Sequence, residues 1–104
     1  MNPGIRFEDE ADAEYRFAGR WYESRREHLG IEFFDAVDET IDQILALPHS
    51  GTPVANLPSG LPVRRMAVAR FPYHVVYLEA DRTIRMLVIA HDRRTPGYWN
   101  DRLK

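Results

Sequence analysis

Residues 63 to 91 contain three consecutive runs with the two-residue periodicity of β-strands, at roughly 63 to 70, 73 to 80 and 83 to 91. In the second and third runs both alternating sets of side chains are largely apolar, so both faces of these strands must be covered. A short link, Ala80 to Arg82, joins these two runs as a hairpin. The pattern therefore predicts a small, mainly antiparallel sheet with protein on each side.

Two amphipathic helices are expected before this sheet. From Asp9 onward, aromatic and alanine residues three or four apart give a first helix one apolar face, and Trp21 and Tyr22 should lie in the core and at the rim of its packing on the sheet. We expect Gly30 to end this helix in a left-handed conformation. A second helix is predicted from about Ile31 to Leu47, and the short link makes the pair an antiparallel hairpin.

The remaining segments complete a single α+β domain over residues 1 to 104. Residues 5 to 7 alternate in polarity and are long enough only for a short strand, whereas residues 48 to 62 contain four prolines and two glycines and are expected to form a mobile or partner-contacting loop. The helical hairpin can cover only one face of the sheet. The other face is packed either by the chain itself, for example by its C-terminal segment, or by a partner.

Composition excludes several kinds of site. The chain has no cysteine, so no disulfide, thiolate metal site or cysteine nucleophile is available, and a reducing cytoplasm is the expected location. No apolar run is long enough for a secretory signal or a membrane span. The four histidines lack metal-ligand spacing with carboxylates, so we predict neither a metal nor a cofactor.

Charge is distributed unevenly along the chain. Residues 1 to 51 hold five arginines and twelve acids, a balance of −7, while residues 52 to 104 hold eight arginines, one lysine and four acids, a balance of +5. Two arrangements are compatible with this distribution. Either one face of the domain is basic and suits a polyanion or an acidic partner, or ion pairs between the halves cancel the field.

Four segments carry a resemblance to a known family: WYESRREHLGIEFFDAV on the helices, the loop LPHSGTPV, the strand region VRRMAVARFPYHVVY and the closing IAHDRRTPGYW. Together they resemble the toxin of the RelE/ParE toxin–antitoxin superfamily over nearly the whole chain. The resemblance implies a compact α+β toxin, with a short N-terminal strand and a helical hairpin on the sheet. It also implies a cognate antitoxin that wraps the toxin in a hetero-oligomer and covers spare apolar surface.

The RelE-like branch of this superfamily cleaves mRNA on the ribosome without a metal, and it needs cations and proton-transfer groups. Here Ala67 and Asp92 stand where that branch has basic residues, and His74 replaces a strand arginine. The loss of cations weakens stabilisation of the transition state, so a non-enzymatic protein is the preferred interpretation. If the chain is a metal-independent endoribonuclease, the resemblance assigns catalysis to Arg65, His74, His91, Arg94 and Tyr98.

The ParE-like branch blocks DNA gyrase by binding and needs no hydrolytic site, and the long WYE hairpin and the RRTPGYW ending resemble it more closely. Our preferred hypothesis is thus a ParE-like type II toxin of the plasmid-stabilisation kind, with Arg93, Arg94, Tyr98 and Trp99 as target-binding residues. For the two aromatic residues, the alternative is that they fold back as cover over the sheet. Two other functions remain open: a RelE-like endonuclease with a degenerate site, or a non-toxic antitoxin-binding module.

Overall fold

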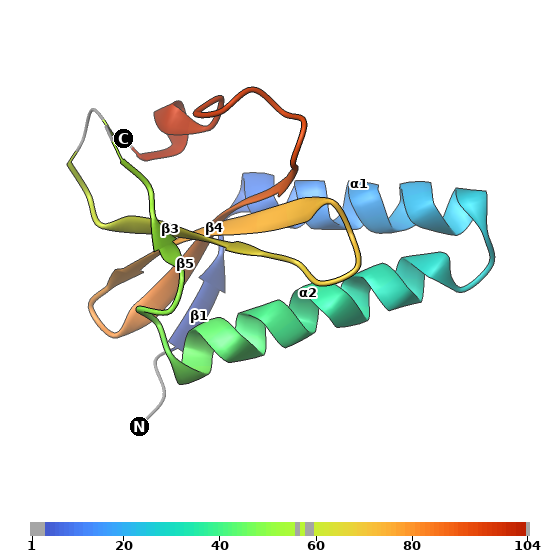
Figure 1. Ribbon diagram of the computed structural model, residues 1–104, viewed down its shortest axis with the longest axis horizontal. Helices are drawn as coiled ribbons and strands as arrows, with labels where there is room; N and C mark the ends of the chain where they lie inside the picture. Colours follow the sequence, from blue (N-terminus) through green and yellow to red (C-terminus); the bar gives the residue numbers. More distant parts are fainter. Residues whose placement is uncertain (1–3, 56, 58–59, 104) are drawn as a thin grey trace.

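The computed structural model describes residues 4–55, 57 and 60–103 and packs two helices on a five-stranded sheet (Figure 1). This arrangement confirms the predicted α+β architecture. The elements, in chain order, are β1 (Gly4–Phe7), α1 (Asp9–Arg25), α2 (Leu29–Ala46), β2 (Thr52–Pro53), β3 (Val63–Ala67), β4 (Tyr73–Ala80), β5 (Thr83–His91) and the short 3-10 helix η1 (Asn100–Leu103).

The strands lie in the order β1-β5-β4-β3-β2, and every neighbouring pair is antiparallel except β1 and β5, which run parallel. The expected short N-terminal strand is therefore an edge strand beside the last strand of the chain. The strand predicted over 63 to 70 ends at Ala67, because the chain turns before β4 and Arg70 takes a left-handed conformation at φ 69°. The loop expected over 48 to 62 contains the two-residue strand β2, which pairs with β3.

The β4–β5 hairpin has a tight turn and a β-bulge, and the bulge affects which face of the sheet its side chains occupy. Asp81 and Arg82 both have positive φ, at 52° and 61°, as in the type I′ turns that match the twist of paired strands. Val76 pairs with Val88, but the next residue, Tyr77, pairs with Met86, so β5 contains one extra residue, a β-bulge. Leu87 is that extra residue, and both Leu87 and Val88 join the cluster on the face away from the helices.

The helical hairpin turns at His28, which is left-handed at φ 72°, and not at the predicted Gly30. Gly30 lies in the first turn of α2, where a Cβ would be 2.6 Å from the carbonyl oxygen of Gly19. The backbone N–H groups of His28 and Gly30 donate to the Glu23 carboxylate, which lowers the pKa of Glu23. Gly30 thus permits close helix packing, and a side chain from α1 takes the place of an N-cap residue.

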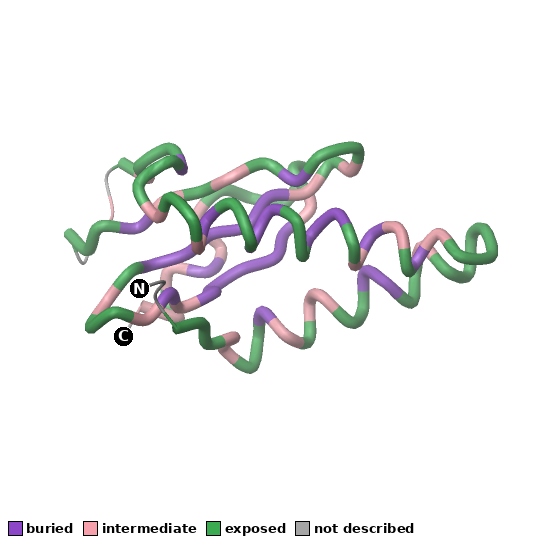
Figure 2. The backbone as a smooth tube through the Cα atoms, turned by 90° about the horizontal axis from the view of Figure 1, so that it is seen from below, coloured by how far each residue is buried: buried purple, intermediate pink, exposed green. Residues whose placement is uncertain are grey.

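The first core lies between the helices and the sheet. Buried side chains of both layers meet there, including Phe33, Ile44, Val75, Tyr77, Ile84 and Met86. Figure 2 shows buried residues concentrated on the strands and on the sides of the helices that face them. Tyr22 is half-buried against Phe33, with ring centroids 5.3 Å apart, as expected for the rim. Trp21 is 45% exposed, so its predicted place in the core is wrong.

The opposite face of the sheet is covered by the chain itself, the first of the two alternatives that the sequence left open. Trp99 is 5% exposed and packs on this face, and Tyr98 and Leu103 pack beside it. In Figure 1 the C-terminal segment, residues 92–103, leaves the end of β5, turns back and ends in η1. The strand residues buried on this face are Val63, Val76, Leu78, Leu87, Val88 and Ala90.

Candidate functional site

A cavity of about 100 Å³ opens where β3 and β4 meet the C-terminal segment. We call it the Arg65 cavity. The polar and aromatic residues of its lining are Arg65, His74, Asp92, Arg94, Thr95, Tyr98 and Trp99.

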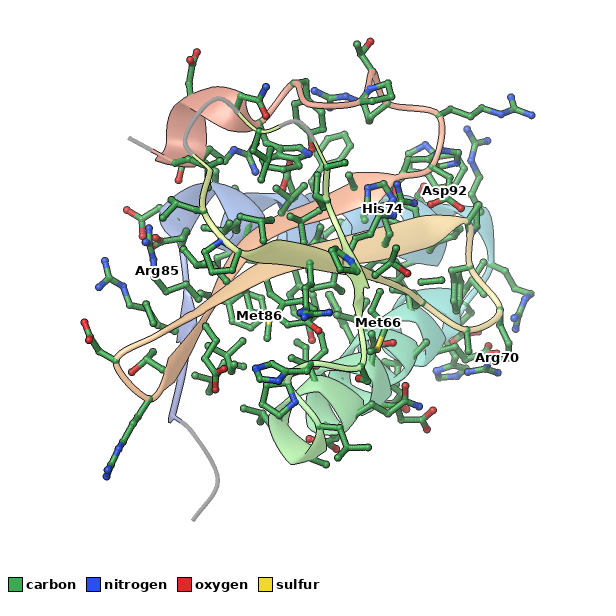
Figure 3. All side chains as sticks on the ribbon, turned by 60° about the vertical axis from the view of Figure 1, so that its left-hand side comes forward. Met66, Arg70, His74, Arg85, Met86 and Asp92 are labelled. Atoms are coloured by element: carbon green, nitrogen blue, oxygen red, sulfur yellow. The ribbon has the colours of Figure 1, made fainter. Side chains whose placement is uncertain are left out.

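The strand register explains how these side chains meet. Arg65 lies two residues after Val63, and His74 two residues before Val76, so alternation places both on the face away from the helices. The N–H of Asp92 donates to the carbonyl of Pro72 at 2.8 Å, which brings the residue after β5 beside the start of β4. Figure 3 shows His74 and Asp92 side by side, across the strands from Met66 and Met86.

His74 and Asp92 form a pair at the mouth of the cavity. Nδ1 of His74 lies 2.9 Å from Oδ1 of Asp92. The imidazole is buried, with only 8% of the residue exposed, whereas the carboxylate side chain is 49% exposed. Asp92 therefore fixes the orientation of His74 and places a negative charge beside Arg65 and Arg94.

Tyr98 supports the second arginine of the cavity. The guanidinium carbon of Arg94 lies 3.8 Å from the centroid of the Tyr98 ring, a cation–π contact. The Tyr98 hydroxyl donates to the carboxylate of Glu14 on α1. Burial, followed by this hydrogen bond, raises the pKa of Tyr98 to about 12. At physiological pH the hydroxyl therefore keeps its proton and donates it in the hydrogen bond to Glu14.

The predicted target-binding residues differ in their accessibility. Arg93 and Arg94 are exposed, Tyr98 is half-buried and Trp99 is buried. Trp99 is therefore cover for the sheet, the alternative already raised by the sequence, and its indole is not available at the surface of this conformation. The exposed part of the predicted surface consists of the two arginines and the accessible part of the tyrosine ring.

His91 lies apart from the other four predicted catalytic residues. It packs on Tyr73, with ring centroids 5.2 Å apart, and lines a groove of about 450 Å³ between α1 and the end of the β4–β5 hairpin. The structure thus brings Arg65, His74, Arg94 and Tyr98 to one cavity and leaves His91 outside it. We call the second feature the aromatic groove; it is lined by Phe17, Trp21, Tyr22, Pro72, Tyr73 and His91.

Sequence reasoning missed Glu14. It lies on α1 three residues after Ala11 and four before Ala18, both of which are buried. A carboxylate on the buried stripe of a helix needs a partner, so its position was a signal that could have been used. That partner is the C-terminal segment, through Tyr98 and Arg102.

The charges of the two halves are partly paired. Arg85 contacts Glu8, Arg102 contacts Glu14 at 2.9 Å, and the more distant pair Arg70 and Glu32 is at 4.0 Å. By contrast, Arg65, Arg93 and Arg94 form no ion pair with a described residue. Both arrangements that the sequence left open are thus present in part, and two of these arginines, Arg65 and Arg94, line the Arg65 cavity.

Over residues 4–55, 57 and 60–103, no three histidine, cysteine, aspartate or glutamate side chains are grouped so as to hold a metal ion. Neither described helix has the length and apolar character needed to cross a membrane.

Comparison with known proteins gives matches among solved structures. A chain of the chromosomal ParDE toxin–antitoxin system from P. aeruginosa matches with a TM-score of 0.68 and 18% identity, over 86% of this chain and 95% of that one. The chain has the RelE/ParE fold. The E. coli toxin RelE, as a double arginine-to-alanine mutant in the free state, matches with a TM-score of 0.64 and 14% identity, over 94% of this chain and 92% of that one. No protein-family model matches the sequence, and no curated protein does.

The RelE/ParE resemblance noted in the sequence is therefore confirmed at the level of the fold. Both neighbours cover more than four-fifths of this chain. A fold can carry more than one chemistry, so the function must be argued from the site.

Proposed function

We propose that this protein is the toxin of a type II toxin–antitoxin system and that it acts in the ParE-like manner, by binding DNA gyrase. The observation that carries the proposal is that the Tyr98 hydroxyl, one of the proton-transfer groups that the resemblance assigns to RNA cleavage, is donated to Glu14. His91, another of those groups, lies outside the Arg65 cavity. A surface built in this way suits binding better than catalysis of RNA cleavage.

The charge of the cavity supports the same choice. Cleavage of a phosphodiester develops negative charge in the transition state, which cations must stabilise. The Arg65 cavity has two arginines, but Asp92 adds a carboxylate where the RelE-like branch has a basic residue. Gyrase binding requires no such stabilisation, so this substitution does not weaken it.

The exposed arginines form the proposed target contact. Arg93 and Arg94 follow the end of β5 and are open to solvent. Arg94 is held against the Tyr98 ring before any target arrives, and a preorganised arginine on an aromatic ring is typical of residues that contribute strongly to protein interfaces. The match to the ParDE chain, at the higher of the two TM-scores, agrees with this choice.

The aromatic groove is the proposed contact for the cognate antitoxin. Phe17 is 66% exposed and Trp21 45% exposed, although both are large apolar side chains. The guanidinium carbon of Arg25 lies 4.7 Å from the centroid of the Trp21 ring, so the groove has a basic flank. An antitoxin segment with apolar side chains and acidic neighbours would cover this surface in a toxin–antitoxin hetero-oligomer.

One observation favours the second candidate, a RelE-like endonuclease that acts on the ribosome and mRNA. Arg65, His74 and Arg94 line a single cavity, and a histidine oriented by a carboxylate is a common arrangement for proton transfer. A third candidate, a non-toxic module that binds the antitoxin, requires only the aromatic groove.

Expression of the chain in growing bacteria, with and without the gene that neighbours its own, separates the three functions. Our proposal predicts growth arrest, loss of DNA supercoiling in the cytoplasm and rescue by the neighbouring gene. Arrest with cleaved mRNA and normal supercoiling would identify the endonuclease. Normal growth at a measured, soluble protein level would leave the non-toxic module.

A further inference from the structure

Glu14 on α1 hydrogen-bonds to three residues of β5 and the C-terminal segment. Its side chain is 19% exposed. One oxygen, Oε1, accepts from the N–H of Ile89 at 3.0 Å and from Nη1 of Arg102 at 2.9 Å. The other, Oε2, accepts from Nη2 of Arg102 at 2.9 Å and from the Tyr98 hydroxyl. A single carboxylate thus joins α1, β5 and the C-terminal segment.

This junction lies where β5 loses its strand neighbour. β1 pairs with β5 only as far as Phe7 and Met86. Beyond that point Glu14 accepts from the Ile89 N–H, and Arg102 donates to the carbonyl of Leu87 at 2.9 Å. The two side chains together satisfy backbone groups on a strand edge that would otherwise be open. The ion pair is therefore anchored on both sides by backbone atoms of β5.

The same junction sets the position of Arg94. With its hydroxyl on Glu14, the Tyr98 ring presents one face to Arg94, and Arg102 lies 5.3 Å from the ring centroid. The next residue, Trp99, is inserted into the covered face of the sheet. Release of Tyr98 and Arg102 from Glu14 would therefore free both the support of Arg94 and the residue that closes the sheet.

We infer that Glu14 is a positioning residue: it holds the C-terminal segment against β5 so that Tyr98 presents Arg94 to the target. The functional half of this inference rests on the proposed gyrase-binding role of Arg94. The structural half does not, because it concerns only the attachment of residues 98–103 to α1 and β5. Glu14 acts through Tyr98 and Arg102, beneath the proposed contact.

Fluorescence tests the structural half. The chain has two tryptophans, so Trp21→Phe leaves Trp99 as the sole indole. In that background, used for fluorescence alone, Glu14→Ala should make Trp99 accessible to acrylamide, raising its quenching constant by about threefold as expected for exposure of a buried side chain on a loosened segment. Far-ultraviolet circular dichroism should stay unchanged. The matched control is Glu39→Ala, which removes an exposed glutamate from α2 and should leave quenching as it was.

Gyrase inhibition tests the functional half. Relative to the unmodified sequence, Glu14→Ala should require about tenfold more protein for half-inhibition of supercoiling, the loss expected for one charge-assisted hydrogen bond. Glu14→Gln, which keeps one acceptor oxygen but loses the paired contact with Arg102, should lie between the two. If Glu14→Ala does not fold, Glu14→Gln supplies both readouts.

Unchanged quenching of Trp99 in a folded Glu14 variant would overturn the inference. Increased quenching with unchanged inhibition would overturn its functional half, because Arg94 would then not depend on the junction. Failure of the proposed function is a separate result: the unmodified protein would not inhibit gyrase at all, and the quenching data would still decide whether Glu14 holds the C-terminal segment.

Discussion

Nδ1 of His74, the second residue of β4, lies 2.9 Å from Oδ1 of Asp92, the first residue after β5. The contact orients a buried imidazole with a half-exposed carboxylate. Removal of this imidazole would distinguish the two toxic mechanisms, because RNA cleavage needs a catalytic histidine and gyrase binding does not.

His74→Ala is the substitution that uses this difference. If the protein acts by binding gyrase, inhibition of supercoiling should persist at nearly the unmodified protein concentration. If His74 transfers protons during RNA cleavage, its removal should reduce the rate of ribosome-dependent cleavage by about 100-fold or more. The measurement is half-inhibition of purified gyrase beside mRNA cleavage on purified ribosomes, with thermal melting as the check that the variant folds.

Arg94→Ala tests the proposed target contact. The guanidinium is exposed, and its removal should raise the concentration for half-inhibition of gyrase by about tenfold or more, as for a residue that dominates an interface. The melting temperature should not change. Tyr98→Phe should also reduce toxicity because it removes the hydroxyl held by Glu14. Arg6→Ala, an exposed arginine on β1, is the control, and equal effects of Arg6 and Arg94 would assign the result to net charge.

Trp21→Ala tests the aromatic groove. The indole is 45% exposed, so its loss should cost the folded toxin little stability. It should weaken binding of the cognate antitoxin by about tenfold or more, as expected for an interface tryptophan, when measured by titration calorimetry. Ile31→Ala, which removes a 58% exposed apolar side chain from α2 outside the groove, is the matched control. If Trp21→Ala leaves antitoxin binding unchanged, the aromatic groove is not the antitoxin contact.

The two helical glycines should respond differently to alanine. At Gly19 a Cβ would lie 2.1 Å from Cζ of Phe34, whereas at Gly30 it would lie 2.6 Å from the backbone oxygen of Gly19. A second substitution can shorten the Phe34 side chain, but no substitution can remove the backbone oxygen of Gly19. Gly30→Ala should lower the free energy of unfolding by about 2 kcal/mol, despite the higher helix propensity of alanine. The stability lost in Gly19→Ala should be regained in the double variant Gly19→Ala with Phe34→Leu. Urea denaturation decides, and a Gly30→Ala protein of unchanged stability would contradict the close packing.

The tyrosines predict a limit to stability at alkaline pH. Burial raises the pKa of all five above the ordinary value of 10.0, and for Tyr98 to about 12. Because the folded state holds these protons more tightly than the unfolded state, the stabilisation is complete below pH 10 and is lost as the pH rises toward 12. Tyrosinate absorbance should therefore appear together with loss of near-ultraviolet circular dichroism. Tyrosinate formed near pH 10 in a protein that keeps its fold would contradict the burial.

Regular periodicity predicted the helices and strands because it reflects which face of each element is buried. The turn of the helical hairpin was misplaced for a specific reason: glycine is the usual left-handed residue, but here Glu23 caps α2 from a distance and leaves that conformation to His28. Trp21 was misplaced because helical spacing does not tell how far the sheet extends beneath α1. The strand β2 was missed because two residues carry no period.

The site was predicted only in part because it depends on strand alternation and on contacts distant in sequence. His74 and His91 lie on paired strands, yet they face opposite sides of the sheet, so a list of candidate bases cannot show that only one reaches the cavity. Trp99 closes the sheet because the C-terminal segment turns back, a feature that depends on Glu14 some 80 residues earlier. The position of Glu14 on the buried stripe of α1 signals that it needs a partner, but nothing local in the sequence says that the partner is the C-terminal segment.

The most direct test of the central claim is a supercoiling assay with purified protein, run beside an mRNA cleavage assay on purified ribosomes at the same concentrations. We predict that the protein inhibits gyrase, that Arg94→Ala weakens this inhibition and that mRNA remains intact. Cleaved mRNA with fully active gyrase would contradict the claim.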